Sequence, residues 1–396
     1  MKLNDIVCVS ACRTAMGRFG GKLRSFDVRK LGALVISGAL KRAGIEGSEV
    51  DEVLVGHCRQ AGNGPNPAKI SSVWGGIPQD VHAVTINNAC PSGMKAAILG
   101  AQNILLGEIT TAMIAGMESM STIPYLLKTG RWDGFRMGDQ VLQDGWYDTR
   151  DPICDMLMGQ TAENLVERYK ISREEQDEFA LSSHQKAAKA QDEGWFDEEI
   201  IPIIIPATKK QPEEVFDKDE PVRRDTSLEK LAKLKPAFKE GGSVTAGNSC
   251  GLSDGASGLI LMSRDKARAL GLKPLFSIVS YASVGVENAY MGEGPAVAIP
   301  KALAKAGMEL GDMDLIEVNE AFAAQILANE RVLRWDRSRL NVHGGAIALG
   351  HPTGESGVRI LVTLYYALKR MDKELGIASI CGGTGVACTM IIKREN

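Results

Sequence analysis

Cys90 is the residue of this 396-residue chain best suited to act as a nucleophile. It follows the apolar run 84–87 and precedes Pro91, after which apolar residues recur at helical spacing. Proline suits the first position of a helix, so Cys90 would lie at or beside the N-cap. There the helix dipole favours a thiolate, and we expect the pKa of Cys90 to lie below its usual ~8.5. The alternative is one more buried cysteine.

His351 is the second candidate, one of only five histidines in the chain. It lies in the turn Gly350-His351-Pro352, ahead of an apolar stripe that predicts another helix. A near-neutral pKa would suit it to take a proton from a thiol. Cys90 and His351 are each followed by Pro-[Ser/Thr]-Gly and a helix. This repeat suggests a duplicated domain with one reactive residue in each half.

Two further polar positions follow predicted strands. Cys381 ends an apolar run and precedes Gly382 and Gly383, whose backbone N–H groups could approach an oxyanion. A dinucleotide-binding turn is disfavoured there, because 386–391 reads as a strand and not as the required helix. Asn319 also ends a strand. We interpret it as a helix N-cap, with a second possible role as an anchor for a water or substrate oxygen.

The elements that must position these residues alternate between strands and helices. Such alternation predicts a layered α/β fold with a mostly parallel sheet. Between 121 and 245 the chain turns charged and proline-containing, with helical pieces over 160–192, which indicates a long insertion of the kind that often acts as a lid. Apolar runs that read as strands lie at 6–11, 53–56, 111–116, 259–262, 278–282 and 315–319, and the first helix is predicted at 28–43.

Composition excludes several function classes. A net charge of −3 and a pI near 6.1 lack the basic surface that nucleic-acid binding requires. No apolar stretch approaches the ~18 residues of a membrane span, and the N-terminus has no signal-peptide core, so we expect a cytoplasmic protein. The eight cysteines form no CxxC pair, and the histidines have no ligand-like spacing, so we predict no metal site.

The motifs together resemble the thiolase family, from about Ile6 to Ile392. The resemblance is specific because many short motifs occur in the family's order and spacing. These motifs are Arg13-Thr14 with Gly17, 62–67, 88–93, 116–120, 245–248, 319–322, 344–348, 350–352 and 381–383.

This resemblance implies an α/β fold of five αβαβα layers, built from two similar domains with an inserted loop domain. The implied boundaries are an N-terminal domain over 1–120 that continues at 246–270, a loop domain over 121–245 that covers the site, and a C-terminal domain over 271–396. It also implies a homodimer or homotetramer.

The resemblance further implies reversible cleavage of a 3-ketoacyl-CoA, or condensation of two acetyl-CoA molecules. Cys90, activated by His351, would carry the acyl group, and Cys381 would exchange the proton of the acetyl-CoA enolate. One oxyanion site would combine His351 with a water held by Asn319, and another the N–H groups of Cys90 and Gly383. Coenzyme A and acyl-CoA would be substrates, with no permanently bound cofactor.

Family positions for coenzyme A and acyl contacts fall on a second set of residues. Arg223 would contact the nucleotide. Cys250 stands where the family usually has a serine that contacts the pantetheine, so that hydrogen bond would be weakened. The pantetheine and acyl pocket would be lined by Met158, Met291 and Phe322.

Other departures concern the surroundings of the reactive groups. Leu157 stands where many acetoacetyl-CoA-specific members have histidine, which affects the expected short-chain preference. Glu355 replaces a small residue, and its carboxylate is expected to raise the pKa of His351 or to reorient it. The turn after Cys381 is shorter than usual, which bears on the role of Gly383.

Three alternatives compete with this interpretation. A ketoacyl synthase-like condensing enzyme would typically have histidine in place of Cys381. A non-catalytic or differently specific acyl-CoA-binding relative would not need all four polar positions. A cysteine hydrolase using Cys90, His351 and Asn319 would leave Cys381 unexplained.

Overall fold

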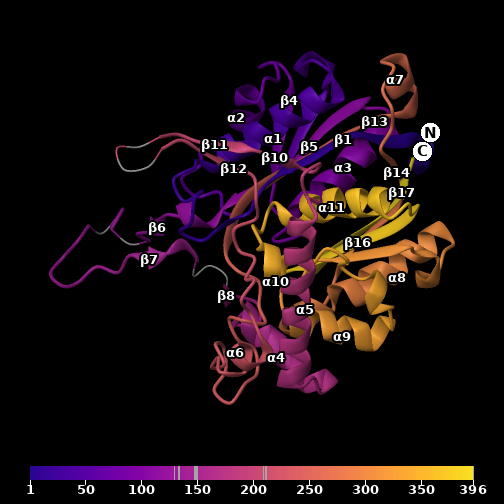
Figure 1. The fold of residues 1–396 in the computed structure, drawn as a ribbon. Coiled ribbons are helices and arrows are strands. Elements are labelled where there is room, and N and C mark those ends of the chain that lie inside the picture. The colour runs from indigo at the N-terminus through magenta and orange to yellow at the C-terminus, as the bar shows by residue number, and fades with distance from the viewer. Residues whose placement is uncertain (129, 133, 147–149, 208, 210–211, 396) are drawn as a thin grey trace.

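Most strands of the protein belong to one sheet with two similar halves. The computed structural model describes residues 1–396 except 129, 133, 147–149, 208, 210–211 and 396. The main path of the 11-stranded sheet runs β15-β16-β17-β14-β1-β13-β5-β3-β4. Its halves meet where β1 (Ile6–Thr14) pairs with β14 (Phe276–Gly285) through only two residue pairs. The two halves can therefore lean apart and enclose helices between them (Figure 1).

Each half repeats the same strand order. The first half has the spatial order β1-β13-β5-β3-β4. Numbered along the chain within this half, the order is first, fifth, fourth, second and third strand. The second half has the same order, except that its third strand is reduced to one parallel bridge, between Ile316 and Leu340. The predicted duplication is confirmed. The remaining strands are β3 (Glu52–Gly56), β4 (His82–Ile86), β5 (Thr111–Ser119), β13 (Ser253–Ser263), β15 (Leu315–Val318), β16 (Leu375–Gly382) and β17 (Val386–Arg394), and at the edges β2 (Gly17–Arg18) and β10 (Ile200–Ile201) pair with β13 and β1.

The sheet is mixed, so the prediction of a mostly parallel sheet was wrong. Strands β3, β4 and β5 are parallel, as are β15 and β16. The last strand of each half, β13 or β17, is antiparallel to both of its neighbours in that half. In the second half the cause is local, because the short turn at 383–385 can join β16 to β17 only as an antiparallel pair.

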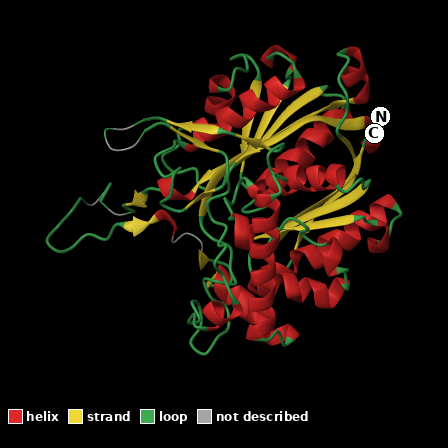
Figure 2. Cartoon of the chain, in the orientation of Figure 1, coloured by secondary structure: helices red, strands yellow, loops and turns green. Residues whose placement is uncertain are grey.

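Helices cover both faces of each half-sheet. Helices α3 (Ser92–Leu106) and α11 (Ser356–Arg370) lie between the two halves and share one apolar core with the inner faces of both. Helix α11 is buried on every side from Ser356 to Leu368. The outer faces pack against α1 (Val28–Ala43) and α2 (Pro67–Trp74) in the first half, and against α8 (Gly294–Ala306) and α9 (Ala323–Leu333) in the second. The predicted αβαβα layering is confirmed (Figure 2).

A long segment is inserted between β5 and β13. It contains the predicted helical pieces, α4 (Met158–Tyr169) and α5 (Arg173–Asp192), and a short α6 (Leu228–Ala232). Its strands form small two-stranded pairs, and the pair β6 (Tyr125–Leu126) and β7 (Gln143–Asp144) belongs to an arm that extends away from the body (Figure 1). The other pairs are β8 (Arg150–Asp151) with β9 (Met156–Leu157), and β11 (Ile203–Ile205) with β12 (Glu214–Phe216).

Two short helices complete the fold. They are α7 (Arg264–Ala269), which follows β13, and α10 (Ala346–Leu349), which precedes His351. In the part of the chain that the structure describes, no helix is long and apolar enough to cross a membrane.

Candidate active site

The predicted reactive residues lie at equivalent places in the two halves. Cys90 follows β4 and precedes α3, while His351 precedes the equivalent helix α11. Cys381 is the residue before the last of β16, and Asn319 directly follows β15. Ligand sites of α/β sheets lie at the carboxyl ends of strands, because loops converge there. Here the corresponding ends of the two halves face one site.

The turn around Cys90 is held by several hydrogen bonds. The Cys58 thiol donates to the Ala89 carbonyl (2.9 Å), and the Asn88 N–H donates to the Ser92 hydroxyl (2.8 Å). Ala89 has a φ of 51°, in the left-handed region that is costly for residues other than glycine. Pro91 is the N-cap and α3 begins at Ser92, so Cys90 lies one residue further out than a first-turn proline would put it.

Cys90 is a protonated thiol at neutral pH. Burial raises its pKa to about 11, although the N–H groups of Gly383 and of Cys90 itself and the charge of Arg59 all lower it. The expectation of a lowered pKa was therefore wrong. The expectation included the favourable dipole of a helix start but left out desolvation. The sulfur is enclosed between the two half-sheets, and this burial disfavours the thiolate more strongly than the dipole favours it.

His351 is a neutral base with a defined tautomer. The Ser356 hydroxyl donates its only proton to the Pro352 carbonyl (2.9 Å). The contact of 2.7 Å between this hydroxyl and His351 Nδ1 must therefore be donated by Nδ1–H, which leaves a lone pair on Nε2. Nε2 is buried and has no hydrogen-bond partner among the described residues. Burial lowers the pKa of His351 to about 4, well below the near-neutral value expected.

Cys381 lies beside Cys90 in an apolar enclosure. Its side chain is 1% exposed and packs in a cluster with Met291 and Phe322, against which Met158 also packs. Burial raises the pKa of Cys381 far above its usual range, and the neighbouring Cys90 raises it further. The resting state therefore contains two uncharged thiols, one with a polar environment and one with an apolar environment.

Asn319 is fully buried, and both polar atoms of its side chain lack partners among the described residues. Its backbone N–H donates to the Ser379 carbonyl (3.0 Å), which fixes its position beside β16. The N-cap interpretation was wrong, because α9 begins only at Ala323 with Phe322 as its N-cap. A buried amide without protein partners usually binds water or a ligand, so the side chain is free for such a role.

Gly383 faces the sulfur of Cys90 despite the short turn. The N–H of Gly383 and the N–H of Cys90 both act on this sulfur. A Cβ added at Gly383 would lie 3.0 Å from the Met158 sulfur, and one at Gly382 would lie 3.1 Å from the Cys90 nitrogen. A side chain at position 382 would therefore push the turn away from Cys90, whereas one at position 383 would meet the flexible Met158 side chain.

Glu118, for which no role was predicted, links the two halves next to the site. This buried carboxylate lies 2.8 Å from His57 Nδ1 and accepts hydrogen bonds from the N–H groups of Cys58 (2.9 Å) and Gly354 (2.9 Å). Further donors are the Thr353 hydroxyl (3.0 Å) and the Arg59 N–H (3.1 Å). Beside His57 and these donors, the pKa of Glu118 falls to about 2. The only available signal was a charged residue inside the apolar run 111–120.

Glu355 does not tune His351 as expected. It precedes α11, which begins at Ser356, and its carboxylate bonds to the Ser257 hydroxyl. The charges that act on the pKa of His351 are Arg359, which lowers it, and Glu118, which raises it. Burial raises the pKa of Glu355 itself to about 7. The prediction of a raised histidine pKa was therefore wrong.

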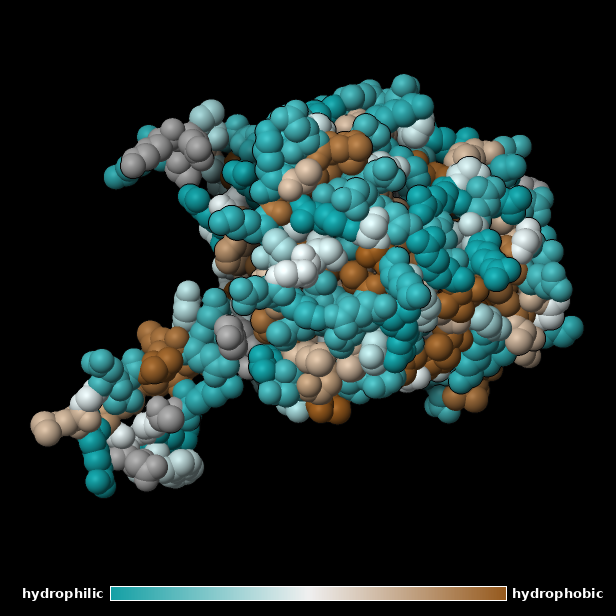
Figure 3. Space-filling view, turned by 90° about the horizontal axis from the view of Figure 1, so that it is seen from below, coloured by the Kyte–Doolittle hydropathy of each residue, from teal (hydrophilic) through white to brown (hydrophobic). Residues whose placement is uncertain are grey.

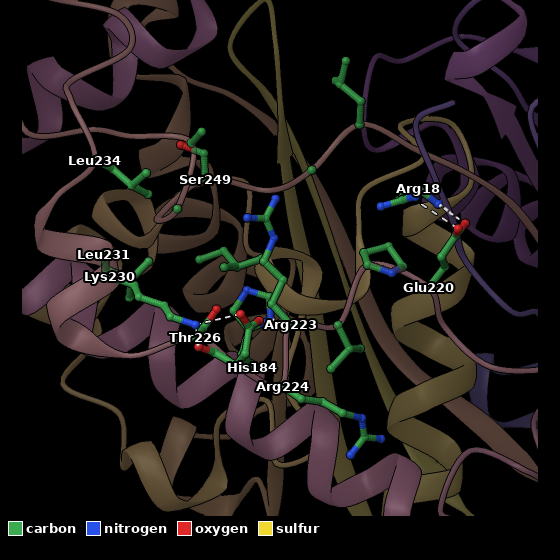
Figure 4. A pocket seen from close by; sticks show the side chains of 18 of the residues that line it. Arg18, His184, Glu220, Arg223, Arg224, Thr226, Lys230, Leu231, Leu234 and Ser249 are labelled. Atoms are coloured by element: carbon green, nitrogen blue, oxygen red, sulfur yellow. Dashed lines mark hydrogen bonds and ion pairs between the residues drawn. The ribbon is translucent and has the colours of Figure 1, made fainter. Parts of the chain in front are cut away.

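A pocket of about 920 Å³ opens beside His351, whose backbone N–H donates to the carbonyl of the pocket residue Gly251 (3.1 Å). Arg223 lies in its wall (Figure 4). Among the described residues, the Arg223 guanidinium has no carboxylate within ion-pair distance, whereas Arg18 pairs with Glu220 (3.3 Å) and Lys230 with Asp225 (2.7 Å).

The remaining predicted contacts lie deeper. Cys250 is absent from the pocket lining and lies close to the other two thiols. Burial raises the pKa of Cys250 and the neighbouring Cys90 raises it further, while Cys250 in turn adds to the raised pKa of Cys381. Leu157, at the end of β9, is half-buried and immediately precedes α4. Among residues with described positions, no group of three or more His, Cys, Asp or Glu is placed to hold a metal ion.

Comparison with known families settles the ancestry of this arrangement. The family model described as "Thiolase, N-terminal domain" matches residues 6–265, and "Thiolase, C-terminal domain" matches residues 272–394. The chain belongs to the thiolase family. The predicted domain boundaries, which assign the inserted segment to a unit of its own, remain a prediction.

Full-length relatives are similar over the whole chain. A curated acetyl-CoA acetyltransferase of Cupriavidus necator is 47% identical over 99% of this chain and 100% of its own length. The crystal structure of the Bacillus anthracis acetyl-CoA acetyltransferase has a TM-score of 0.96 at 46% identity and 99% coverage of both chains. Human mitochondrial 3-ketoacyl-CoA thiolase in complex with CoA has a TM-score of 0.94 at 40% identity, covering 99% of this chain and 98% of its own.

The high pKa of Cys90 predicts how the thiolase thiol reacts in the absence of substrate. Only the thiolate reacts with iodoacetamide, so the rate of labelling at Cys90 should rise about tenfold per pH unit between pH 7 and 9. Mass spectrometry of the Cys90 peptide at timed intervals measures this rate. A rate that is already constant from pH 6 would instead indicate a resting thiolate–imidazolium pair and contradict the assignment of neutral groups.

Proposed function

We propose that this thiolase cleaves a 3-ketoacyl-CoA with coenzyme A, and forms one in the reverse direction, through an acyl-Cys90 intermediate. The observation that carries this proposal is the set of reactive groups at one buried site. It contains two thiols, a histidine whose Nε2 has no partner among the residues described, and the Asn319 amide, which likewise has none there. The cysteine at position 381 also disfavours a ketoacyl synthase-like enzyme, which would typically have histidine there.

The first step forms the acyl-enzyme. Neutral Cys90 attacks the 3-keto carbon and gives its proton to His351 Nε2, which is the free base of the ring. Both groups are uncharged at rest, so charge develops only as the reaction proceeds. The Ser356 hydroxyl supports this step because it accepts from Nδ1–H and keeps the lone pair on Nε2.

Cleavage of the C2–C3 bond then releases acetyl-CoA as an enolate. Cys381 protonates this carbon in the cleavage direction and removes the proton in the synthetic direction. The strongly raised pKa of the buried Cys381 supports this role, because such a thiol stays protonated until a basic carbanion forms beside it. Coenzyme A then takes the acyl group from Cys90.

Two groups of donors would stabilise the oxygen anions of these steps. The N–H groups of Cys90 and Gly383 would bind the oxygen of the acyl group on Cys90. A water held by the unpartnered amide of Asn319, together with His351, would bind the enolate oxygen. The loss of one such donor typically costs about 2.7–4 kcal/mol of barrier.

Coenzyme A would occupy the pocket that contains Arg223. Its volume of about 920 Å³ lies within the range of about 300–1,000 Å³ typical of ligand sites. The unpaired guanidinium of Arg223 could bind the charged nucleotide end, and the link from Gly251 to His351 would lead the thiol end to Cys90. Cys250 lies near the inner end, where a pantetheine contact is possible, and Met158, Met291 and Phe322 would line the acyl side.

The extended arm supports assembly with a second copy of the chain, as a homodimer or homotetramer. Exposed apolar side chains that gather on a surface often mark an interface, and the projecting arm carries a hydrophobic cluster among mostly hydrophilic atoms (Figure 3). All eight cysteines are free thiols, which fits a reducing compartment such as the cytoplasm. The exposed apolar residues of the arm are Tyr125, Leu127, Trp132, Phe135, Met137, Val141 and Leu142.

Separate roles for the two thiols predict different defects. Cys90→Ala should abolish CoA-dependent cleavage of acetoacetyl-CoA. Cys381→Ser should still exchange labelled CoA with acetyl-CoA, because this exchange needs only acyl transfer to Cys90. The same variant should lose the exchange of acetyl-CoA methyl protons with D2O, which NMR measures. Retention of cleavage in Cys90→Ala, or of methyl exchange in Cys381→Ser, would contradict the mechanism.

Removal of the Ser356 hydroxyl should impair the base. Ser356→Ala leaves Nδ1–H without its acceptor and no longer fixes the lone pair on Nε2, so kcat/KM for acetoacetyl-CoA should fall by about 100-fold. Ser280→Ala is a matched control, because its buried hydroxyl bonds only to the Ala302 carbonyl (2.8 Å) in the second half-sheet. Equal losses in both variants would attribute the effect to packing instead.

The arm should control assembly. The double substitution Trp132→Ser and Met137→Ser should yield a smaller species than the parent in analytical ultracentrifugation at the same concentration. Leu106→Ser, which changes an exposed leucine at the end of α3, serves as the control and should leave the mass unchanged. A parent protein that is already monomeric at micromolar concentration would refute the proposed assembly.

A further inference from the structure

Arg59 lies close to the nucleophile on a loop that the proposed mechanism does not use. The loop follows β3, and its Cys58 side chain contacts residues on both sides of Cys90, at the Ala89 carbonyl (2.9 Å) and the Ser92 hydroxyl (3.4 Å). Both polar groups of the Arg59 backbone form hydrogen bonds: its N–H donates to the Glu118 carboxylate (3.1 Å), and its carbonyl accepts from the Asn63 side chain (3.0 Å). The position of Arg59 is therefore well defined.

The guanidinium of Arg59 has no acidic partner in the part of the chain that the structure describes. Glu118, the carboxylate bound by the Arg59 backbone, directs its oxygens to His57, Cys58, Thr353 and Gly354 as well. Among the described residues no carboxylate lies within ion-pair distance of Arg59, and its Nε is buried without any acceptor. Its planar group lies 5.5 Å from the Trp146 ring centroid. A half-buried arginine that is held against an aromatic ring and left unpaired fits the recognition of a carboxylate.

The anion that Arg59 would bind belongs to another part of the substrate than the nucleotide. The pocket with Arg223 has its own unpaired arginine, and Arg59 is not among the residues that line it. Arg59 instead acts on the sulfur of Cys90 from the loop after β3. Since Cys90 receives the acyl group, a negative charge near Arg59 would be on the acyl chain.

We propose that Arg59 selects 3-ketoacyl-CoA substrates whose acyl chain ends in a carboxylate. This inference rests on the proposed thiolase reaction and specifies its substrate class. The Cys90 thiol attacks the 3-keto carbon, the C2–C3 bond breaks, and C2 gains a proton. The thiol of coenzyme A then attacks the acyl-Cys90 thioester, so that a new thioester forms and the Cys90 thiol is released. The products are acetyl-CoA and the CoA thioester of a dicarboxylic acid two carbons shorter, so atoms and charges balance without any oxidant.

The test compares substrates that differ only in the terminal carboxylate. The parent should cleave 3-ketoadipyl-CoA or 3-ketopimelyl-CoA with a kcat/KM about 10- to 100-fold above that for the neutral ketoacyl-CoA of the same length. Arg59→Gln should remove this preference, and Arg59→Lys should retain part of it. Arg268→Gln, at an exposed site on α7, is the charge-matched control and should leave the preference intact.

The ratio of the two kcat/KM values isolates carboxylate recognition from other effects of Arg59. A contribution only to Cys90 reactivity would lower both values equally in Arg59→Gln and leave the ratio unchanged, which would overturn the proposal. If Arg59 contacted coenzyme A, Arg59→Gln would raise KM for CoA equally with both substrates. The ratio would again be unchanged, and the proposal would be overturned. A parent that prefers the neutral substrate would also overturn it. Failure to cleave any 3-ketoacyl-CoA would instead refute the thiolase reaction itself.

Discussion

Burial of α3 and α11 between two half-sheets is the constraint on which the rest of the site depends. Cys90 lies in the turn before α3 and His351 in the turn before α11, so the packing that encloses the helices also removes these two residues from water. Desolvation disfavours the charged form of every group. It raises the pKa of both thiols and lowers that of His351, which leaves an uncharged site at rest. Catalysis then depends on hydrogen-bond donors that stabilise negative charge as it develops in the transition state.

The duplicated strand order explains how so many functional groups reach one site. Equivalent positions in the two halves carry Cys90 and His351 before the central helices, and His57 and Asn319 directly after β3 and β15. Glu118 and Cys381 are each one residue before the end of an equivalent strand. In the first half, these positions hold the carboxylate of Glu118 and its partner His57, which anchor the neighbouring loops. In the second half, they hold Cys381, the second thiol of the site, and the amide of Asn319. The same backbone geometry thus serves both anchoring and chemistry.

Local sequence context was enough to single out Cys90, His351 and Cys381 as candidates, because turns at the ends of strands are visible in the sequence, and the structure brings these turns to one site. Their catalytic roles stay a prediction. The order of the motifs along the chain was enough to predict the family resemblance and, through it, the five layers of the fold. The signs of the pKa shifts were not accessible, since they depend on burial by α11, which is distant in the chain. The prediction that Asn319 caps a helix was wrong because the end of the strand is visible in the sequence, whereas the later start of α9 at Ala323 is not. Glu118 and Arg59 gain their meaning only from partners far apart in the sequence.

Glu118 shows why the uncharged site still requires one ionised group beside it. Its folded pKa of about 2 lies below the ordinary 4.5, so its contribution to stability is complete above pH 4.5 and is lost as the pH falls toward 2. His351, with a folded pKa of about 4 against 6.5, also favours the unfolded state as the pH falls below 6.5. Both groups therefore make the junction between loops 57–59 and 353–354 sensitive to acid. Like burial, the carboxylate that fixes this junction raises the pKa of Cys90, so the proposed nucleophile stays a neutral thiol at rest.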